Sequence, residues 1–204
     1  MGHAITAIIR AVGEKRASEL DQLATQLLRQ GLKTRIVTQI PGDSPNTTLE
    51  RVIAEPVDTH RALLLEDDVV LAPDFHERVK RYLAHGWPLL SGFSRRKEDL
   101  ETYLNGEDHR IMPYPVYYST MCLVILNELR SDLLEFCKKW YVEHESRTAA
   151  DLMCSAWAKS HKIPIRVAIP SLVQHRSIVS VIDRRRSRNR RSETFKRHYG
   201  EIGE

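Results

Sequence analysis

Short apolar runs alternate with amphipathic segments along most of this chain. Residues 4–12 and 33–40 are short enough to be buried strands, and the segment between them places leucines at the three- and four-residue spacing of a helix. The alternation continues, with further strands expected at 61–65, 88–93, 116–126 and 163–169. Strands that alternate with helices build a mostly parallel sheet flanked by helices. The sequence therefore predicts a single α/β domain, which we assign to residues 1–182.

Local capping signals predict the helix ends. Ser18 and Thr47 each precede an acidic residue by three positions, a pattern that caps helix N-termini, and Ser131 is expected to cap another helix. Gly31 stands where the first helix should end, because glycine accepts the left-handed backbone found there. A last helix is expected to begin near Thr148.

The composition is that of an ordinary globular protein. Hydrophobic residues make up 42% of the chain and charged residues 28%, which excludes a collagen-like or wholly disordered chain. No run of about 18 apolar residues is present, and the first residues lack the basic segment and cleavage site of a signal peptide. Cys122, Cys137 and Cys154 have no CxxC spacing, so we expect buried free thiols in a reducing compartment. These features predict a cytoplasmic protein.

Motifs of several large enzyme classes are absent. The chain contains no GxxxxGK[ST], GxGxxG, GxSxG or HExxH. These patterns mark P-loop enzymes, typical dinucleotide enzymes, serine hydrolases and zincins, respectively. None of these four classes is therefore favoured by the sequence.

An apolar run at 63–65 leads directly into Glu66, Asp67 and Asp68. Placing three acids at the end of a buried strand is unfavourable unless something neutralises their charge. Open α/β sheets bind ligands at the carboxyl ends of parallel strands. Mg²⁺ and Mn²⁺ prefer carboxylate oxygens and share their coordination shell with substrate phosphates. The cluster is therefore a candidate site for a metal ion and a diphosphate; the alternative is a turn whose acids face water.

Two stretches together resemble a known enzyme superfamily. In the first, the acidic cluster follows an apolar run and precedes Val-Val-Leu and Pro-Asp-Phe. In the second, Asp151 opens a helix, a strand follows, and the segment Pro-Ser-Leu-Val-Gln-His ends at His175. This order is similar to the core of the DxD-type GT-A glycosyltransferases, which use nucleotide-sugar donors and a divalent metal. Arg176 departs from the pattern, because the family would place a glycine there.

The resemblance implies a metal site and a donor site. Asp68 would be the direct metal ligand and His175 a further ligand for Mn²⁺ or Mg²⁺, and an imidazole suits Mn²⁺ better. Glu66 and Asp67 would bind the donor, through its ribose or through metal-bound water, although which acid touches the metal stays open. Without the resemblance, His175 is as well explained as a loop histidine bonded to the backbone.

Three further residues receive roles from the same resemblance. Asp151 would be the general base on the acceptor hydroxyl of an inverting transfer; the alternative is an acid that complements the dipole of its helix. Arg10 would bind the base or a phosphate of the donor, and residues 13–16 follow at the edge that holds base and ribose. Gly92 would lie against the donor, next to a basic segment.

The net charge of +4 resides entirely in residues 183–204, and residues 1–182 are neutral. Six arginines fall within eight positions of this segment, namely Arg184, Arg185, Arg186, Arg188, Arg190 and Arg191. Like charges at such spacing repel, so the segment should bind an anionic partner. Leu, Ile, Val and Phe are absent from 183–194, which disfavours a membrane helix and favours nucleic acid. The alternative is a helix that packs on its own domain.

These features lead to one main functional hypothesis, a metal-dependent glycosyltransferase of the hexosyl type with a UDP-sugar donor. The arginine segment suggests a hydroxymethylated base in DNA as the acceptor, as in bacteriophage enzymes of this kind; a surface polysaccharide or a lipid-linked glycan is the alternative acceptor. A nucleic-acid-binding module is a hypothesis of another class, but it leaves the acidic cluster unexplained. A metal-dependent nuclease or nucleotidyltransferase would explain both the acids and the arginines.

Overall fold

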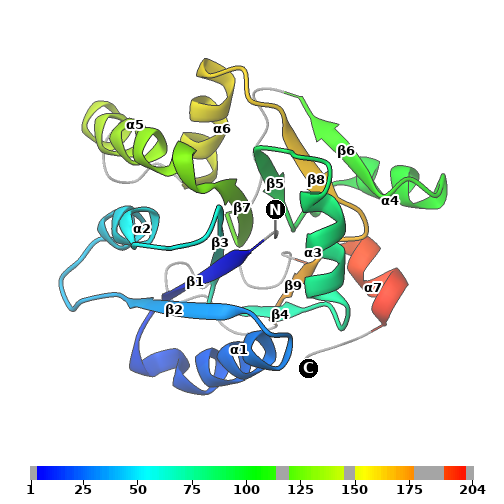
Figure 1. Cartoon of the computed structure of the whole chain (residues 1–204), viewed down its shortest axis with the longest axis horizontal. Helices are drawn as coiled ribbons and strands as arrows, with labels where there is room; N and C mark the ends of the chain where they lie inside the picture. Colours follow the sequence, from blue (N-terminus) through cyan, green and yellow to red (C-terminus); the bar gives the residue numbers. More distant parts are fainter. Residues whose placement is uncertain (1–3, 114–119, 145–149, 177–190, 201–204) are drawn as a thin grey trace.

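A seven-stranded sheet forms the centre of the computed structural model (Figure 1), which describes residues 4–113, 120–144, 150–176 and 191–200. The strands are β1 (Ile5–Ala11), β2 (Lys33–Thr38), β3 (Arg61–Glu66), β4 (Val69–Leu71), β5 (Leu89–Ser91), β6 (His109–Met112), β7 (Cys122–Leu126), β8 (Ile165–Ala168) and β9 (Val173–His175). The helices are α1 (Ala17–Arg29), α2 (Pro45–Ala54), α3 (Phe75–Leu83), α4 (Lys97–Leu104), α5 (Arg130–Glu143), α6 (Ala150–Ser160) and α7 (Glu193–Tyr199), with 3-10 turns η1 (Glu14–Arg16) and η2 (Asn127–Leu129).

The order of strands in the main sheet is β2-β1-β3-β7-β5-β8-β6, and β4 pairs with β9 in a separate two-stranded sheet. Strands β1, β2 and β3 run parallel, as do β5 and β8. Strand β7 lies antiparallel between β3 and β5, and β6 is antiparallel to β8. The carboxyl ends of β1, β3 and β5 therefore meet the first residues of β7 at one edge of the sheet. The prediction of an α/β domain with a mostly parallel sheet is confirmed.

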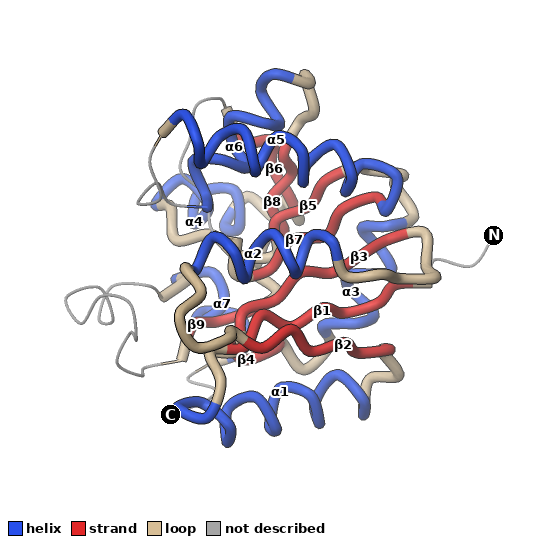
Figure 2. Tube along the Cα trace, turned by 90° about the vertical axis from the view of Figure 1, so that its left-hand side faces the viewer, coloured by secondary structure: helices blue, strands red, loops and turns tan. Residues whose placement is uncertain are grey.

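Alternation along the strands divides the core between the two faces of the sheet. In β1, Ile5 and Ile9 pack toward α1 and α3, whereas Ile8 packs toward α2, α5 and α6. The same switch occurs in β3, where Leu63 and Leu65 face one helix layer and Leu64 the other. In Figure 2, α2 crosses in front of the strands and α3 lies behind them. Both faces are apolar because helices cover both, as expected for a parallel sheet.

Three of the predicted helix caps are wrong. Ser18 lies inside α1, because that helix begins at Ala17 and its N-cap position is Arg16. Helix α2 begins at Pro45, and Ser44 caps it by accepting a hydrogen bond from the backbone N–H of Thr47 at 3.1 Å. Proline suits the first helical position because it lacks the N–H that would be unpaired there. Helix α5 begins one residue before Ser131, because η2 leads directly into it. Gly31 follows the end of α1 with a φ of 75°, as predicted.

The expected strand at 61–65 corresponds to β3, and the other predicted elements need small adjustments. β3 ends at Glu66, and the chain then turns and enters β4 in the other sheet. The polar stretch 97–110 contains α4 and the start of β6. The expected strand at 116–126 corresponds to β7, and the expected helix near residue 148 to α6; residues 114–119 and 145–149 lie outside the described part.

The last described segment packs on the domain. Ser192 caps α7, and Phe195 is fully buried in the core cluster that also contains Phe75 and Tyr82 of α3. The hydroxyl of Tyr199 donates to Asp74 and accepts from an arginine of α3. Residues 192–199 are therefore held by the domain core, whereas the alternative of a packed helix for the arginine run lies almost entirely outside the described residues. The predicted boundary between residues 182 and 183 lies outside the described residues.

The cysteines are free and buried, as the sequence predicted. Burial raises the pKa of Cys122 and of Cys137 to about 12, so neither thiol supplies a thiolate near neutral pH. Among the described residues, no helix is long and apolar enough to cross a membrane.

Candidate functional site

The acidic cluster occupies the turn between β3 and β4. Glu66 is the last residue of β3, and Asp67 and Asp68 form the turn. The backbone N–H of Asp67 donates to the carbonyl of Arg10 at the end of β1, at 3.2 Å. On the other side, the pairing of β4 with β9 sets Val69 opposite His175. The two sheets thus bring His175 beside the acidic turn at the carboxyl edge.

Asp68 and His175 form a buried pair. Their side chains are almost inaccessible, and His175 Nε2 lies 3.2 Å from Asp68 Oδ2. His175 Nδ1 lies 2.6 Å from the carbonyl oxygen of Arg176, so Nδ1 carries the proton and donates it. In the neutral ring, Nε2 then presents a lone pair toward the carboxylate. The sequence offered two alternatives for His175, a histidine bonded to the backbone or a metal ligand. The structure allows both, because Nδ1 bonds to the backbone while Nε2 faces Asp68.

Two acceptor atoms of this pair have no hydrogen-bond partner within the described chain. These are His175 Nε2, whose contact with Asp68 lacks hydrogen-bond direction, and Asp68 Oδ1. Buried polar atoms are nearly always paired, so unpaired ones need an explanation. A backbone-bonded imidazole beside a carboxylate is typical of metal ligands and their supporting contacts.

Arg16 neutralises much of the charge in the turn. Its Nη1 lies 2.7 Å from Asp67 Oδ1 and 2.6 Å from Asp68 Oδ2, and the guanidinium is buried. Asp67 also accepts the backbone N–H of Val12 at 2.7 Å. Burial raises the pKa of Asp67 despite these contacts. Burial also acts to raise the pKa of Asp68, but the positive charges of His175, in its protonated form, and of Arg16 outweigh burial and lower that pKa to about 2.

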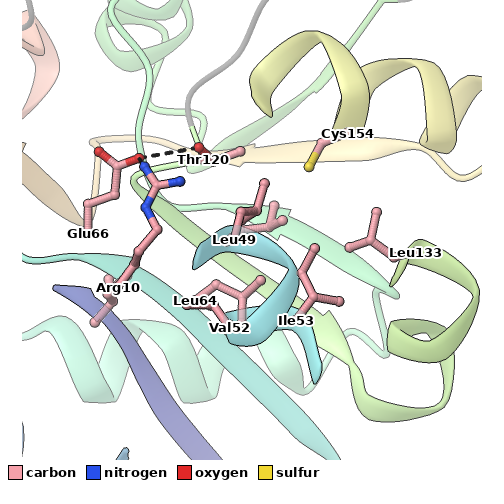
Figure 3. A pocket seen from close by; sticks show the side chains of 11 residues that line it. Arg10, Leu49, Val52, Ile53, Leu64, Glu66, Thr120, Leu133 and Cys154 are labelled. Atoms are coloured by element: carbon pink, nitrogen blue, oxygen red, sulfur yellow. Dashed lines mark hydrogen bonds and ion pairs between the residues drawn. The ribbon is translucent and has the colours of Figure 1, made fainter. Parts of the chain in front are cut away.

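A second cluster lies beside the turn. Arg10 Nη2 pairs with Glu66 Oε1 at 2.6 Å, and the hydroxyl of Thr120 donates to the same oxygen at 3.4 Å. The backbone N–H of Thr120 donates to Asp151 Oδ1 at 2.8 Å. Figure 3 shows Arg10, Glu66 and Thr120 converging from three elements. Thr120 therefore connects two predicted site residues, Glu66 and Asp151, and Glu66 in turn holds a third, Arg10.

An open hollow extends from this second cluster. It is small, with a volume of about 10 Å³, enough for about one water molecule, and it lies on the side of the sheet covered by α2, α5 and α6. Arg10, Glu66 and Thr120 line its polar end (Figure 3). Its apolar lining comes from Leu49, Val52, Ile53, Leu64, Leu65, Leu123, Leu133 and Cys154. The polar end thus combines a cation, a carboxylate and a hydroxyl next to an apolar wall.

Gly92 lies at the same edge but has a packing reason for being glycine. A Cβ at this position would be 2.3 Å from Cys122 Sγ, so any side chain would force the strands apart. Its N–H donates to the carbonyl of Cys122, and its carbonyl accepts the N–H of Leu172 at 2.7 Å. The donor-binding role of Gly92 stays a prediction. Of the six arginines at 184–191, the described residues include only Arg191, which is partly buried.

The pairing of Arg16 with the two aspartates was not predicted from the sequence. The sequence placed residues 13–16 near the donor but named no partner for Arg16. Parallel pairing of β1 with β3 brings the loop that follows β1 next to the turn that follows β3. Two buried acids in that turn require a nearby cation, and this charge balance was the signal that could have identified Arg16.

The donor set fits a hard divalent cation. Asp68 and His175 offer a carboxylate oxygen and an imidazole nitrogen, ligands that Mn²⁺ accepts. Within the described ranges, no three His, Cys, Asp or Glu side chains converge into a complete cation site. A cation held by two side chains would complete its shell with waters and substrate phosphates, as Mg²⁺ commonly does.

Comparison with known proteins identifies the fold. No family model and no curated protein sequence matches the chain. A glycosyltransferase involved in the glycosylation of the major capsid of PBCV-1 aligns with a TM-score of 0.58 and 12% identity, over 89% of this chain and 96% of that one. A197 from STIV aligns at 0.53 and 14%, over 87% and 86%. The galactosyltransferase LgtC, solved with donor and acceptor sugar analogs, aligns at 0.50 and 12%, over 80% and 73%. These structural alignments establish a shared fold, and at identities this low they establish the fold alone.

Proposed function

We propose that this protein is a metal-dependent glycosyltransferase that transfers a sugar, of the hexose type, from a UDP-sugar to an acceptor hydroxyl. One observation carries the proposal: the buried Asp68–His175 pair leaves two acceptor atoms unpaired at the carboxyl edge of the sheet, in the part of the chain described. Ligands bind at this edge in open α/β folds. The fold shared with two glycosyltransferases supports the choice of reaction.

Asp68 and His175 would hold the cation, Mn²⁺ or Mg²⁺. When bound, the cation supplies Lewis-acid stabilisation of the phosphate oxygen that leaves with the nucleotide. The hydrogen bond from His175 Nδ1 to the backbone of Arg176 fixes the ring so that Nε2 faces Asp68. Asp67, held by Val12 and Arg16, keeps the turn in place and lies where the donor ribose or metal-bound water would bind.

Arg10 and Glu66 would orient the donor beside the cation. Arg10 is held by Glu66, and its guanidinium can donate to a phosphate or to the edge of a base. Glu66 can accept from a ribose or sugar hydroxyl. Both line the polar end of the small hollow, so a donor bound at this edge of the sheet would meet a guanidinium and a carboxylate.

Asp151 would act as the general base. It would take the proton of the acceptor hydroxyl while that oxygen forms the bond to the sugar carbon and the nucleoside diphosphate leaves. The hydrogen bond from the N–H of Thr120 orients one carboxylate oxygen of Asp151. Thr120 also contacts Glu66, so the proposed base and the donor site share one residue as a support.

The acceptor that we propose is a hydroxymethylated base in DNA. The support is the sequence alone: six arginines within eight positions carry a charge that a surface loop rarely needs. They would bind phosphates and so hold the duplex without reading its sequence. The base would have to leave the stack to bring its hydroxymethyl group to Asp151.

A thermal-denaturation panel of nucleoside diphosphates and nucleotide sugars tests the donor and the metal together. UDP and a UDP-sugar with Mn²⁺, each at about 100 times its dissociation constant, should add about 2.7 kcal/mol to the free energy of unfolding. The same ligands with a chelator should add much less. Equal stabilisation with Mn²⁺ and with the chelator would refute the metal dependence, and no response to any nucleotide would refute the proposal.

The acceptor is tested by replacing arginines rather than by truncation, because deleting residues 183–204 would also remove the buried Phe195. The variant replaces Arg184, Arg185, Arg186, Arg188 and Arg190 by glutamine. About five phosphate contacts predict a slope of log K against log salt of about −4.5 for the wild type, and a much smaller slope for the variant.

A matched control removes five exposed lysines instead: Lys80, Lys138, Lys139, Lys159 and Lys162. It should bind duplex DNA nearly as well as the wild type and transfer sugar to hydroxymethylated DNA. If the arginine variant binds DNA like the control, DNA is not the acceptor, and a polysaccharide or lipid-linked glycan becomes the better hypothesis.

A further inference from the structure

We infer that Arg16 is a built-in counter-ion of the metal site, which leaves the two aspartates when a divalent cation binds and then pairs with the diphosphate of the donor. This inference rests on the proposed function, since it names a partner and a sequence of events at the same site. It assigns Arg16 a positioning role that couples metal binding to donor binding.

Arg16 contacts the two aspartates in the way that a bound metal ion would, through one atom placed between two carboxylate oxygens. A single nitrogen, Nη1, bridges Asp67 Oδ1 at 2.7 Å and Asp68 Oδ2 at 2.6 Å. The guanidinium is buried, yet its Nε has no hydrogen-bond partner in the described structure. The buried Arg78 of α3 instead donates from both Nη1 and Nη2. Arg16 is therefore held by charge at one point, which permits exchange for another cation.

The charge balance favours such an exchange. Asp67, Asp68 and Arg16 together carry one net negative charge. A divalent cation added at Asp68 while Arg16 remained would place two positive groups on the same buried carboxylate, and their repulsion is little screened there. With Arg16 released, the cation and the two carboxylates are neutral. Cation binding and retention of Arg16 on Asp68 therefore oppose each other.

The position of Arg16 in the fold gives its side chain a second partner. It lies in η1, directly after the end of β1, at the edge where the nucleotide is proposed to bind. Arginine pairs with phosphate as well as with carboxylate, through two parallel hydrogen bonds. A diphosphate at the metal would thus offer Arg16 the negative charge that it loses on leaving Asp68.

Because Arg16 has a different partner in each state, the binding of Mn²⁺ and the binding of nucleotide should strengthen each other. Without nucleotide, Mn²⁺ must displace Arg16 and binds weakly. With a nucleoside diphosphate present, Arg16 has a new partner, and Mn²⁺ binds more tightly. By linkage, Mn²⁺ strengthens nucleotide binding by the same factor.

The test measures Mn²⁺ binding rather than activity, by the electron paramagnetic resonance signal of free Mn²⁺. In Arg16→Gln, Mn²⁺ without nucleotide should bind at least about tenfold more tightly than in the wild type, because its competitor is gone. The gain in Mn²⁺ affinity on adding UDP should be smaller in the variant than in the wild type, because Arg16 no longer joins the diphosphate.

Arg176→Gln is the matched control. The Arg176 side chain bonds to Val69 and Gln22 and forms no ion pair with either aspartate among the described contacts, although its backbone N–H donates to the carbonyl of Asp68. Removing its charge should change Mn²⁺ affinity by less than about threefold. If both variants gain equally, the effect is general electrostatics and the inference fails.

The outcomes separate this inference from the proposed function. If the wild type binds Mn²⁺ and UDP but Arg16→Gln gains no Mn²⁺ affinity, Arg16 is not a competitor while the function stands. If no protein binds Mn²⁺, both fail. Should Arg16→Gln not fold, a crystal structure of the wild type with Mn²⁺ and UDP decides: the guanidinium must have left Asp68, and an Arg16–Asp68 pair that persists beside bound Mn²⁺ overturns the inference.

Discussion

Two buried aspartates in this protein have opposite surroundings. Asp99, in the first turn of α4, is 1% exposed, and Asp68 is 4% exposed. Each carboxylate pairs with one arginine, but Asp99 also accepts the backbone N–H of Arg96, so both of its oxygens are used. Asp68 keeps one oxygen without a partner in the described chain and faces a histidine nitrogen that is also unpaired.

The difference indicates which buried carboxylate belongs to a site. A carboxylate whose oxygens are all paired stabilises the fold, and its charge is fully compensated. A carboxylate that the fold leaves incomplete has capacity for a ligand. Burial and ion pairing are common to both residues, so neither property alone identifies the site.

The largest expected effect is on activity. Asp68→Ala should lower kcat/KM for sugar transfer by about 10³-fold or more, because loss of a cation ligand removes several kcal/mol of transition-state stabilisation. His175→Ala should lower it similarly. Asp99→Ala, assayed where it is folded, should keep kcat/KM near that of the wild type. Wild-type activity in purified Asp68→Ala would contradict the assignment of the site.

The next effect is on stability, and it should have the reverse order. Asp99→Ala leaves Arg110 without its carboxylate partner, and breaking such a buried pair costs about 3 kcal/mol in the free energy of unfolding. Asp68→Ala should cost less, because Arg16 keeps its contact with Asp67. Urea denaturation without metal measures both. A larger loss in Asp68→Ala than in Asp99→Ala would show that Asp68 is chiefly structural.

The smallest expected effect is a loss of unfolding free energy at acidic pH. The pKa of Asp68 is lowered from 3.8 to about 2 in the folded protein, so its ionised form stabilises the fold above about pH 4. As the pH falls from about 4 to about 2, this contribution of about 2 kcal/mol is lost, about half of it by pH 3. Asp68→Asn lacks the group, so its unfolding free energy should fall less than that of the wild type between pH 5 and pH 3. Equal losses would contradict the lowered pKa.

Much of the fold follows from the sequence, because period and burial are local signals. The apolar run before Glu66 predicts a buried strand with acids at its end, and β3 has that form. Helix α7 was not predicted, since its seven residues carry little periodicity and its burial depends on the distant Gln174 and Ser171. The cap at Ser44 was missed because Thr47 offered a competing signal three residues later.

The candidate site is less accessible to sequence reasoning. Nothing local links Asp68 to His175, because the pairing of β4 with β9 joins them across half of the chain; a family resemblance suggested the pair. The contact between Thr120 and Asp151 likewise depends on how β7 and α6 pack. Long-range pairing of this kind is set by tertiary structure rather than by spacing along the chain.

The most direct test of the account is pulsed electron paramagnetic resonance of Mn²⁺ bound to the wild-type protein with UDP. A cation held by Asp68 and His175 beside the diphosphate predicts electron spin-echo modulation from one imidazole nitrogen and from phosphorus nuclei. The nitrogen modulation should disappear in His175→Gln and persist in Asp99→Ala. Bound Mn²⁺ without nitrogen modulation in the wild type, or with the same modulation in His175→Gln, would contradict the metal site.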